Sequence, residues 1–280
     1  MLAFVMAALF GVPQFATGAT TPQTIPSIFE DRVLIQATVN GRPLWFHLDT
    51  GANGMFIDRN VAVASGLTPA SDGSVTADVT IGSLRATNAQ FHTISAYGFA
   101  SGVTIVGLIG TPLLESGIFT IDFVKKQVLF YPPGSFDPSS AGVAPTPIDF
   151  DGHVTRVHAW FASTRATMLL DTGAQISMLF QPFANDVTLG GPVTDPASIT
   201  VGYGMKPTTE RQYHVKPLTF GGLRVRDPVI DVVDQAPPIL PTTLFDGVLG
   251  RDVLRFFRMT LDYADQVGYF DPRGGKTVDP

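Results

Sequence analysis

Hydrophobic residues occur along the chain in short apolar runs, and glycine and proline separate one run from the next. The 280 residues include 28 glycines and 22 prolines, and hydrophobic residues make up 45% of the chain. Short apolar runs bounded by turn residues are typical of strands joined by tight turns. The pattern therefore predicts an all-β fold with enough apolar side chains for a sizeable core.

Three short segments occur twice, in the same order. Each copy has an apolar run that leads into Asp-Thr-Gly-Ala, then two short strand-like stretches around a glycine, then two apolar residues and a glycine. In the first copy these segments are 45–52, 80–85 and 107–110, and in the second copy they are 167–174, 219–224 and 247–250. The same number of residues separates Gly110 from Asp122 and Gly250 from Asp262. The shared order and spacing predict an internal duplication.

The duplication predicts two lobes, 30–132 and 151–273, joined by a linker at 133–150 that is rich in proline, glycine and serine. The stretch between the motif aspartate and the turn glycine is longer in the second copy than in the first. This additional stretch alternates around a Gly-Tyr-Gly turn that contains Tyr203 and Gly204. Such alternation predicts a β-hairpin that projects from the second lobe.

The N-terminal segment, 1–19, is an apolar run followed by small residues at Ala16, Gly18 and Ala19. This order is similar to that of a secretory signal peptide. We therefore expect export to the periplasm or secretion, with a mature protein that is soluble. No Lys or Arg precedes the apolar run, which leaves open an uncleaved membrane anchor or a buried first strand.

Charge and cysteine content exclude several classes of function. The 18 basic and 24 acidic residues give a formal net charge of -6, and the basic residues are scattered along the chain. A nucleic-acid partner is not expected from this distribution. Without cysteine there is no disulfide or thiolate nucleophile, and the five histidines lack the close spacing of a zinc site.

The repeated segments resemble those of the aspartic peptidases. The Asp-Thr-Gly-Ala form at 49–52 and 171–174 is more similar to the retropepsin-like branch, with its bacterial members, than to pepsin. The glycine segments ending at Gly110 and Gly250 are similar to the segment that crosses behind the catalytic loop in that family. The resemblance covers nearly all of the chain after the N-terminal segment. It implies a bilobal fold of two β-barrel lobes related by a pseudo-twofold axis, with short helices.

The resemblance also implies an active site in which two carboxylates meet at the pseudo-twofold axis. The residues that it assigns are the catalytic Asp49 and Asp171, supported by Thr50, Gly51, Thr172 and Gly173. Two adjacent carboxylates share one proton, so that the ionised group activates a water and the protonated group donates to the scissile carbonyl. This chemistry needs no metal, cofactor or covalent intermediate.

In this family a hairpin, the flap, closes over an extended polypeptide substrate. The sequence predicts a hairpin only in the second copy, so the flap residues would be Tyr203 and Gly204. Either a single flap is used or a second chain completes the site; we expect a monomer, with a homodimer as the alternative. An ordinary hairpin with an exposed Tyr203 is the other interpretation of this segment, and a loop is expected at Tyr97-Gly98.

Other classes of protein remain compatible with the sequence. The chain could be an inactive member of the same fold that binds extended peptides, or a cell-surface β-rich module that binds glycans. The Asp-Thr-Gly turns could also merely end two strands. A short distance between the carboxyl groups of Asp49 and Asp171 would favour the enzyme.

Some residues near the motifs are expected to be structural. Asp122 and Asp262 each lie between apolar strand residues, and His47 is interpreted as a surface or packing residue. At most one short helix is expected in each lobe, at 113–116 and 253–257. Ala52 and Ala174 cannot donate a side-chain hydrogen bond to the carboxylates, which predicts an activity optimum at mildly acidic pH.

Overall fold

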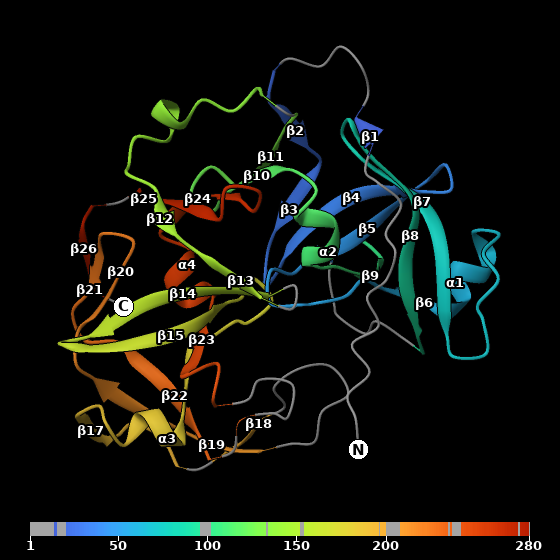
Figure 1. Cartoon of the computed structure of the whole chain (residues 1–280). Helices are drawn as coiled ribbons and strands as arrows, with labels where there is room; N and C mark the ends of the chain where they lie inside the picture. The colour runs from blue at the N-terminus through green and yellow to red at the C-terminus, as the bar shows by residue number, and fades with distance from the viewer. Residues whose placement is uncertain are drawn as a thin grey trace.

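The computed structural model describes residues 14–15, 21–95, 102–132, 134–151, 154–195, 197–199, 208–234, 236, 242–273 and 275–279. In this part of the chain, strands predominate and the helices are short. Figure 1 shows two β-rich lobes side by side, with the N-terminal half of the chain in blue and green and the C-terminal half in yellow to red. The predicted bilobal, all-β fold is confirmed.

The N-terminal lobe is built on one sheet, which has eight strands within the described residues. These strands are β1 (Gln14–Phe15), β3 (Ser27–Phe29), β4 (Val33–Val39), β5 (Arg42–Leu48), β6 (Phe56–Asp58), β7 (Ser74–Ile81), β8 (Leu84–Ile94) and β9 (Ile105–Ile109). Their order is β1-β8-β6-β9-β5-β4-β3, and β7 pairs with both β4 and β8. Alternate residues of β7 are buried, so this strand turns one face to the core.

The C-terminal lobe is built on a sheet of twelve strands within the described residues. They are β13 (Asp149–Asp151), β14 (Val154–Phe161), β15 (Thr164–Leu170), β16 (Met178–Phe180), β17 (Leu189–Pro192), β18 (Ala197–Ile199), β19 (Thr208–Val215), β20 (Leu218–Phe220), β21 (Leu223–Val225), β22 (Val229–Val233), β23 (Gly247–Leu249) and β26 (Thr277–Val278). Their order is β17-β19-β22-β16-β23-β15-β14-β20-β21-β26, with β13 on β14 and β18 on β19.

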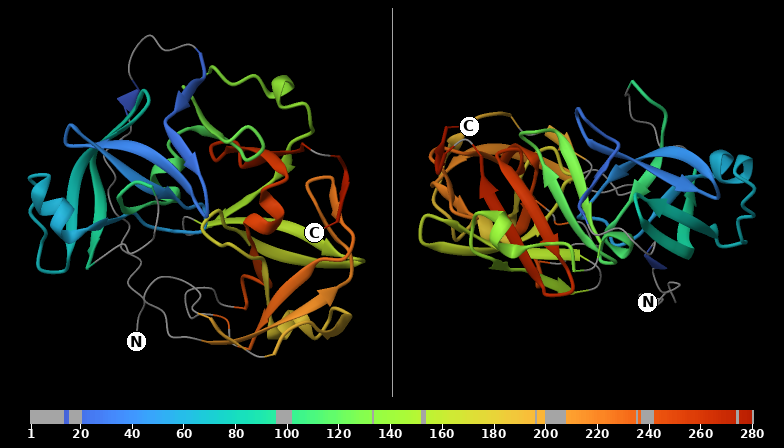
Figure 2. Two further views of the ribbon diagram at one scale, coloured as in Figure 1. Left: turned by 180° about the vertical axis from the view of Figure 1, so that it is seen from behind. Right: turned by 90° about the horizontal axis from the view of Figure 1, so that it is seen from above.

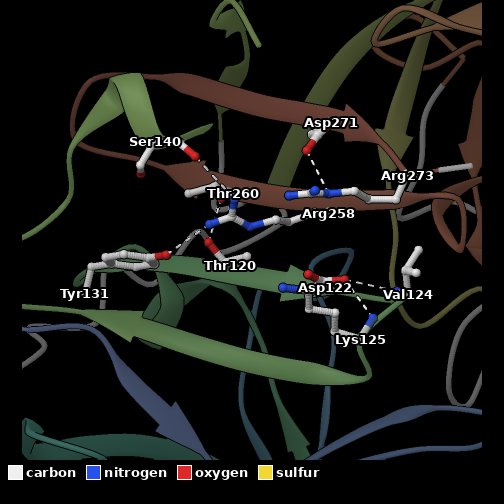
Figure 3. A network of polar contacts seen from close by, with 10 residues as sticks. All are labelled: Thr120, Asp122, Val124, Lys125, Tyr131, Ser140, Arg258, Thr260, Asp271 and Arg273. Atoms are coloured by element: carbon white, nitrogen blue, oxygen red, sulfur yellow. Dashed lines mark hydrogen bonds and ion pairs between the residues drawn. The ribbon is translucent and has the colours of Figure 1, made fainter. Parts of the chain in front are cut away.

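A third sheet joins the two lobes, with six strands within the described residues. It consists of β2 (Gln23–Ile25), β10 (Ile118–Asp122), β11 (Gln127–Tyr131), β12 (Thr146–Pro147), β24 (Phe257–Asp262) and β25 (Val267–Pro272). Figures 1 and 2 place this sheet between the lobes. At its centre β10 pairs antiparallel with β24, and Thr120 lies opposite Thr260 with their hydroxyls 2.5 Å apart (Figure 3). Equivalent strands of the two halves thus meet at equivalent residues.

Two aspartates at the ends of these central strands stabilise turns. Asp122 is 1% exposed and its carboxylate accepts hydrogen bonds from the backbone N–H groups of Val124 and Lys125 at 3.1 and 2.8 Å (Figure 3). Asp262 accepts from the N–H of Asp265 at 3.1 Å. These contacts agree with the structural role expected for both aspartates.

The helices differ from the expectation in number and position. Within the described residues, each lobe has one α-helix beyond α2 (Thr111–Leu114) and α4 (Arg251–Leu254), namely α1 (Arg59–Ala64) and α3 (Gln181–Ala184). The expected limit of one helix per lobe was therefore wrong, and α2 and α4 begin two residues earlier than predicted. Asp58 explains α1, because its carboxylate accepts hydrogen bonds from the N–H groups of Asn60 and Val61 at 2.8 and 3.1 Å.

The ends and the linker add small elements. The linker contains a 3-10 helix, η1 (Pro138–Ala141), and the strand β12, which pairs with β25. Of the segment 1–19, the described residues Gln14 and Phe15 form β1, which pairs with the start of β8. Within the described residues, no helix is long and apolar enough to cross a membrane.

Candidate active site

Each motif aspartate directly follows a strand whose last three residues are buried. Asp49 follows β5, which pairs in parallel with β9, and Asp171 follows β15, which pairs in parallel with β23. The backbone N–H of Asp49 donates to the carbonyl of Ile109 at 3.0 Å, and that of Asp171 donates to Leu249 at 3.1 Å. The apolar residues before each glycine segment therefore anchor the loop that carries the aspartate.

The two loops hold each other through a symmetric set of hydrogen bonds. The hydroxyl of Thr50 donates to the carbonyl of Leu170 at 2.7 Å, and the hydroxyl of Thr172 donates to Leu48 at 2.7 Å. Each hydroxyl also accepts a hydrogen bond from the backbone N–H of the opposite threonine, at 3.0 and 3.1 Å. Both threonines are fully buried. Four buried hydrogen bonds thus fix one loop against the other.

Glycine is required next to each threonine because the opposite carboxylate lies against the backbone. A Cβ atom on Gly51 would lie 2.4 Å from the carboxyl carbon of Asp171. A Cβ atom on Gly173 would lie 2.6 Å from a carboxylate oxygen of Asp49. Contacts this short do not occur for real side chains, so only glycine allows the two carboxylates to approach.

The carboxylates accept backbone hydrogen bonds within their own loops. Asp49 accepts from the N–H of Gly51 at 3.0 Å, and Asp171 accepts from Gly173 at 2.7 Å and from Ala174 at 3.0 Å. The backbone of Ala52 also lowers the pKa of Asp49. Burial raises the pKa of both carboxyls. The negative charge of Asp171 and its hydrogen bond raise the pKa of Asp49 further. The two groups are close enough to compete for one proton.

A cation near Asp171 makes the pKa values of the two carboxyls unequal. Arg251 follows Gly250, and its positive charge lowers the pKa of Asp171, although burial outweighs this effect. The equivalent residue of the first lobe is the neutral Thr111, whose hydroxyl donates to the carbonyl of Ala52 at 2.9 Å. Asp49 is therefore the group that retains a proton more readily.

His47 precedes Asp49 by two residues and is buried, with 3% of its surface exposed. His47 was expected to be either a surface residue or a packing residue, and its burial shows that it is a packing residue. Burial lowers the pKa of His47 to about 3, the charges of Arg32 and Arg251 lower it as well, and a hydrogen bond with the backbone of Thr172 opposes them. The imidazole is neutral and supports the loops from behind.

Sequence reasoning missed a second supporting group in the C-terminal lobe. The hydroxyl of Ser177 donates to Asp252 at 2.7 Å and accepts from the N–H of Gly250 at 2.9 Å. This bridge ties the catalytic loop to the glycine segment behind it. Neither residue belongs to a repeated motif, so the sequence carries no signal for their contact.

The predicted flap lies partly outside the described residues. Tyr203 and Gly204 are not among them, nor are Tyr97 and Gly98. On either side of 200–207, β18 pairs antiparallel with β19, from Ala197 opposite Glu210 to Ile199 opposite Thr208. In the first lobe, residues 65–73 between α1 and β7 form no strand. A hairpin base is thus present in the second lobe at the predicted place.

The fold and the paired aspartates define the class of bilobal aspartic proteinases. A family model described as "Aspartyl protease" matches residues 35–113 and 157–253, which together are more than half of the chain. The chain belongs to the aspartyl protease family. No curated protein matches the sequence.

Solved structures show the same fold at low sequence identity. An aspartic proteinase from Irpex lacteus is 12% identical with a TM-score of 0.55, and the match covers 91% of this chain and 99% of that one. Basic 7S globulin from soybean is 10% identical with a TM-score of 0.49, over 91% of this chain and 95% of that one. The likeness to the Irpex lacteus proteinase shows the two-lobed architecture.

Proposed function

We propose that this protein is an aspartic endopeptidase and that Asp49 and Asp171 form its catalytic dyad. The observation that carries the proposal is the meeting of the two Asp-Thr-Gly loops, in which each glycine backbone lies against the opposite carboxylate. Family membership supports peptide-bond hydrolysis as the reaction. Within the described residues there is no group of three or more His, Cys, Asp or Glu side chains that could hold a metal ion.

In the proposed mechanism the dyad carries one proton between its two carboxyls. Asp171 acts as the general base on a water held between the pair, because the charge of Arg251 favours its ionised form while the charge of Asp171 raises the pKa of Asp49. Asp49 keeps the proton and donates a hydrogen bond to the scissile carbonyl. Attack by the water forms a tetrahedral intermediate, and a proton passed to the amide nitrogen releases the amine product. The hydrogen bonds of Thr50 and Thr172 hold the carboxyls in position throughout.

The substrate is proposed to be an extended polypeptide that adds strand-like hydrogen bonds to the site. The hairpin of the C-terminal lobe, with Tyr203 and Gly204 at its turn, would cover that polypeptide. We further propose that the enzyme works as a monomer, that the two lobes arose by duplication, and that the segment 1–19 directs export.

Cleavage of a randomised peptide library in ¹⁸O-labelled water tests the proposal. We expect cleavage at internal peptide bonds in mildly acidic buffer, with one ¹⁸O atom in each new carboxyl group. Asp171→Asn should abolish cleavage while leaving the thermal unfolding curve intact. Binding of peptides without cleavage at any pH would overturn the proposal and identify an inactive, peptide-binding member of the family.

A further inference from the structure

An apolar wall lies beside the catalytic loop of the C-terminal lobe. Its buried residues are Leu169, Met178, Phe180, Val233, Phe245 and Val248, and Ala174 packs against them. Since the N–H of Ala174 donates to Asp171 at 3.0 Å, the wall begins next to a catalytic carboxylate. The buried side chains of this wall are at most 6% exposed, so a bound polypeptide would meet only its outer edge.

Strand register places two carboxylates on the same face as the wall. Asp231 of β22 is paired with Met178 of β16, and Val233 is paired with Phe180. On the other side of β22, Gln212 lies opposite Asp231 and Glu210 lies opposite Val233. Directly paired residues point to the same face of a sheet. Glu210 and Asp231 are therefore diagonal neighbours that extend the wall with acidic groups.

The burial of Asp231 is costly, and only the Gln212 side chain favours its ionised form. Asp231 is 1% exposed, and neither of its carboxylate oxygens makes a hydrogen bond of ordinary geometry. One buried oxygen of Glu210 also lacks such a bond. Buried polar groups without partners are rare in folded proteins, and each needs an explanation. Glu210 is only partly buried, so this carboxyl can be reached from the surface of the sheet.

Glu210 affects the ionisation of Asp231. Burial raises the pKa of Asp231 to about 7, contact with Glu210 raises it as well, and the Gln212 side chain opposes them. A positive charge placed beside Asp231 would oppose this effect, because it favours the ionised carboxylate.

The first lobe provides an internal comparison. There, Phe56 occupies the place of Met178, and its partner in register is His92, which also lies opposite Ser74. His92 is exposed, and its ring lies 6.0 Å from that of Phe56. An aromatic pair thus takes the place that a buried carboxylate has in the second lobe. The acidic pair is a specific feature of the C-terminal lobe and not a requirement of the fold.

We propose that Glu210 and Asp231 form an acidic subsite that binds a lysine or arginine side chain of the polypeptide substrate. A cationic side chain that reaches the partly exposed Glu210 would bring its charge to the carboxyls. Its donors would add charge-assisted contacts to the one favourable contact from the Gln212 side chain. This inference rests on the proposed peptidase function.

The test is a comparison of kcat/KM for matched peptides. A cleavage profile of the wild-type enzyme first identifies the subsite position at which Lys or Arg is preferred. Two peptides that differ there only by Lys or by norleucine, its uncharged near-isostere, are then compared. We expect the wild type to prefer Lys by about 10- to 100-fold, the range for hydrogen bonds to charged groups. Asp231→Asn and Glu210→Gln should each remove most of this preference.

Controls separate this proposal from the proposed function. Asp234→Asn removes an exposed carboxylate just beyond β22 and should leave the Lys preference unchanged. The ratio of the two kcat/KM values within each variant is the readout, so a general loss of folding or turnover does not count as a loss of the Lys preference. If the wild type shows no preference for a cationic residue at any position, or if Glu210→Gln slows both peptides equally, the acidic subsite is wrong. If no peptide is cleaved at all, the peptidase function itself fails.

Discussion

Replacement of Thr172 by valine tests the hydrogen bonds that hold the two catalytic loops together. Valine has nearly the same shape as threonine but no hydroxyl. The substitution removes the bond to the carbonyl of Leu48 at 2.7 Å and the bond from the N–H of Thr50 at 3.1 Å. Both partners belong to fully buried residues, so each is left without its hydrogen bond.

The expected loss follows from these two groups. A buried donor or acceptor left unpaired costs about 1–3 kcal/mol, so Thr172→Val should lower the free energy of unfolding by about 2–6 kcal/mol. This is a large part of the roughly 5–15 kcal/mol typical of a folded protein. Because the contacts are symmetric, Thr50→Val should cost a similar amount.

Urea unfolding monitored by tryptophan fluorescence measures the effect, with Thr172→Ser as the matched control. Serine keeps the hydroxyl and loses only a methyl group, so it should retain most of the stability and the same dependence on urea. Thr172→Val should also lower kcat, because the carboxyls lose their fixed positions. If the valine and serine variants unfold at the same urea concentration, the reasoning about the loop contacts is refuted.

Three further outcomes are expected. Gly173→Ala should reduce kcat/KM by at least about 100-fold, because its Cβ would lie 2.6 Å from a carboxylate oxygen of Asp49; activity near wild type would contradict the close approach. Between pH 6.5 and about pH 3, His47 is protonated in the unfolded chain but neutral in the folded one. The free energy of unfolding should therefore fall by up to about 1.4 kcal/mol for each unit by which the pH is lowered through this window. His47→Leu introduces the residue that the second lobe has at the equivalent position, Leu169, and should remove this pH dependence of the free energy of unfolding in urea titrations at several pH values. An unchanged pH dependence in this variant would show that His47 is not its source. The raised pKa of Asp49 should keep the dyad singly protonated into mildly acidic pH; Ala174→Ser should move the acidic limb of the kcat/KM profile downward, and an upward shift would contradict the role of the missing hydroxyl.

The sequence was sufficient to predict the architecture because its signals are local. Each Asp-Thr-Gly-Ala segment and each glycine segment is continuous in sequence, and the repeat order implies two equivalent lobes. The helix α1 was missed because it depends on one capping carboxylate, Asp58, within a short polar stretch. The segments that flank 200–207 alternate strongly enough to predict a hairpin, and β18 and β19 pair as its base.

The electrostatic details of the site could not be predicted, since they arise from contacts between distant strands. Glu210 and Asp231 become neighbours only through the register of β19 on β22. Arg251 acts on Asp171 because the glycine segment crosses behind the catalytic loop, which brings its N–H to the carbonyl of Ala174 at 3.0 Å. Nothing in the sequence distinguishes His47 from an ordinary polar residue of a strand, and only the fold shows that it is buried and neutral.

The central claim is that Asp49 and Asp171 act as one catalytic unit, and the most direct test is the kcat/KM of Asp49→Asn, Asp171→Asn and the double variant on one peptide. We expect each single variant to lose at least about 10²–10⁴-fold in kcat/KM. The double variant should be no slower than the single ones, because residues that work as a unit have non-additive effects. Near-normal turnover in either single variant, or losses that multiply in the double variant, would contradict a shared-proton dyad.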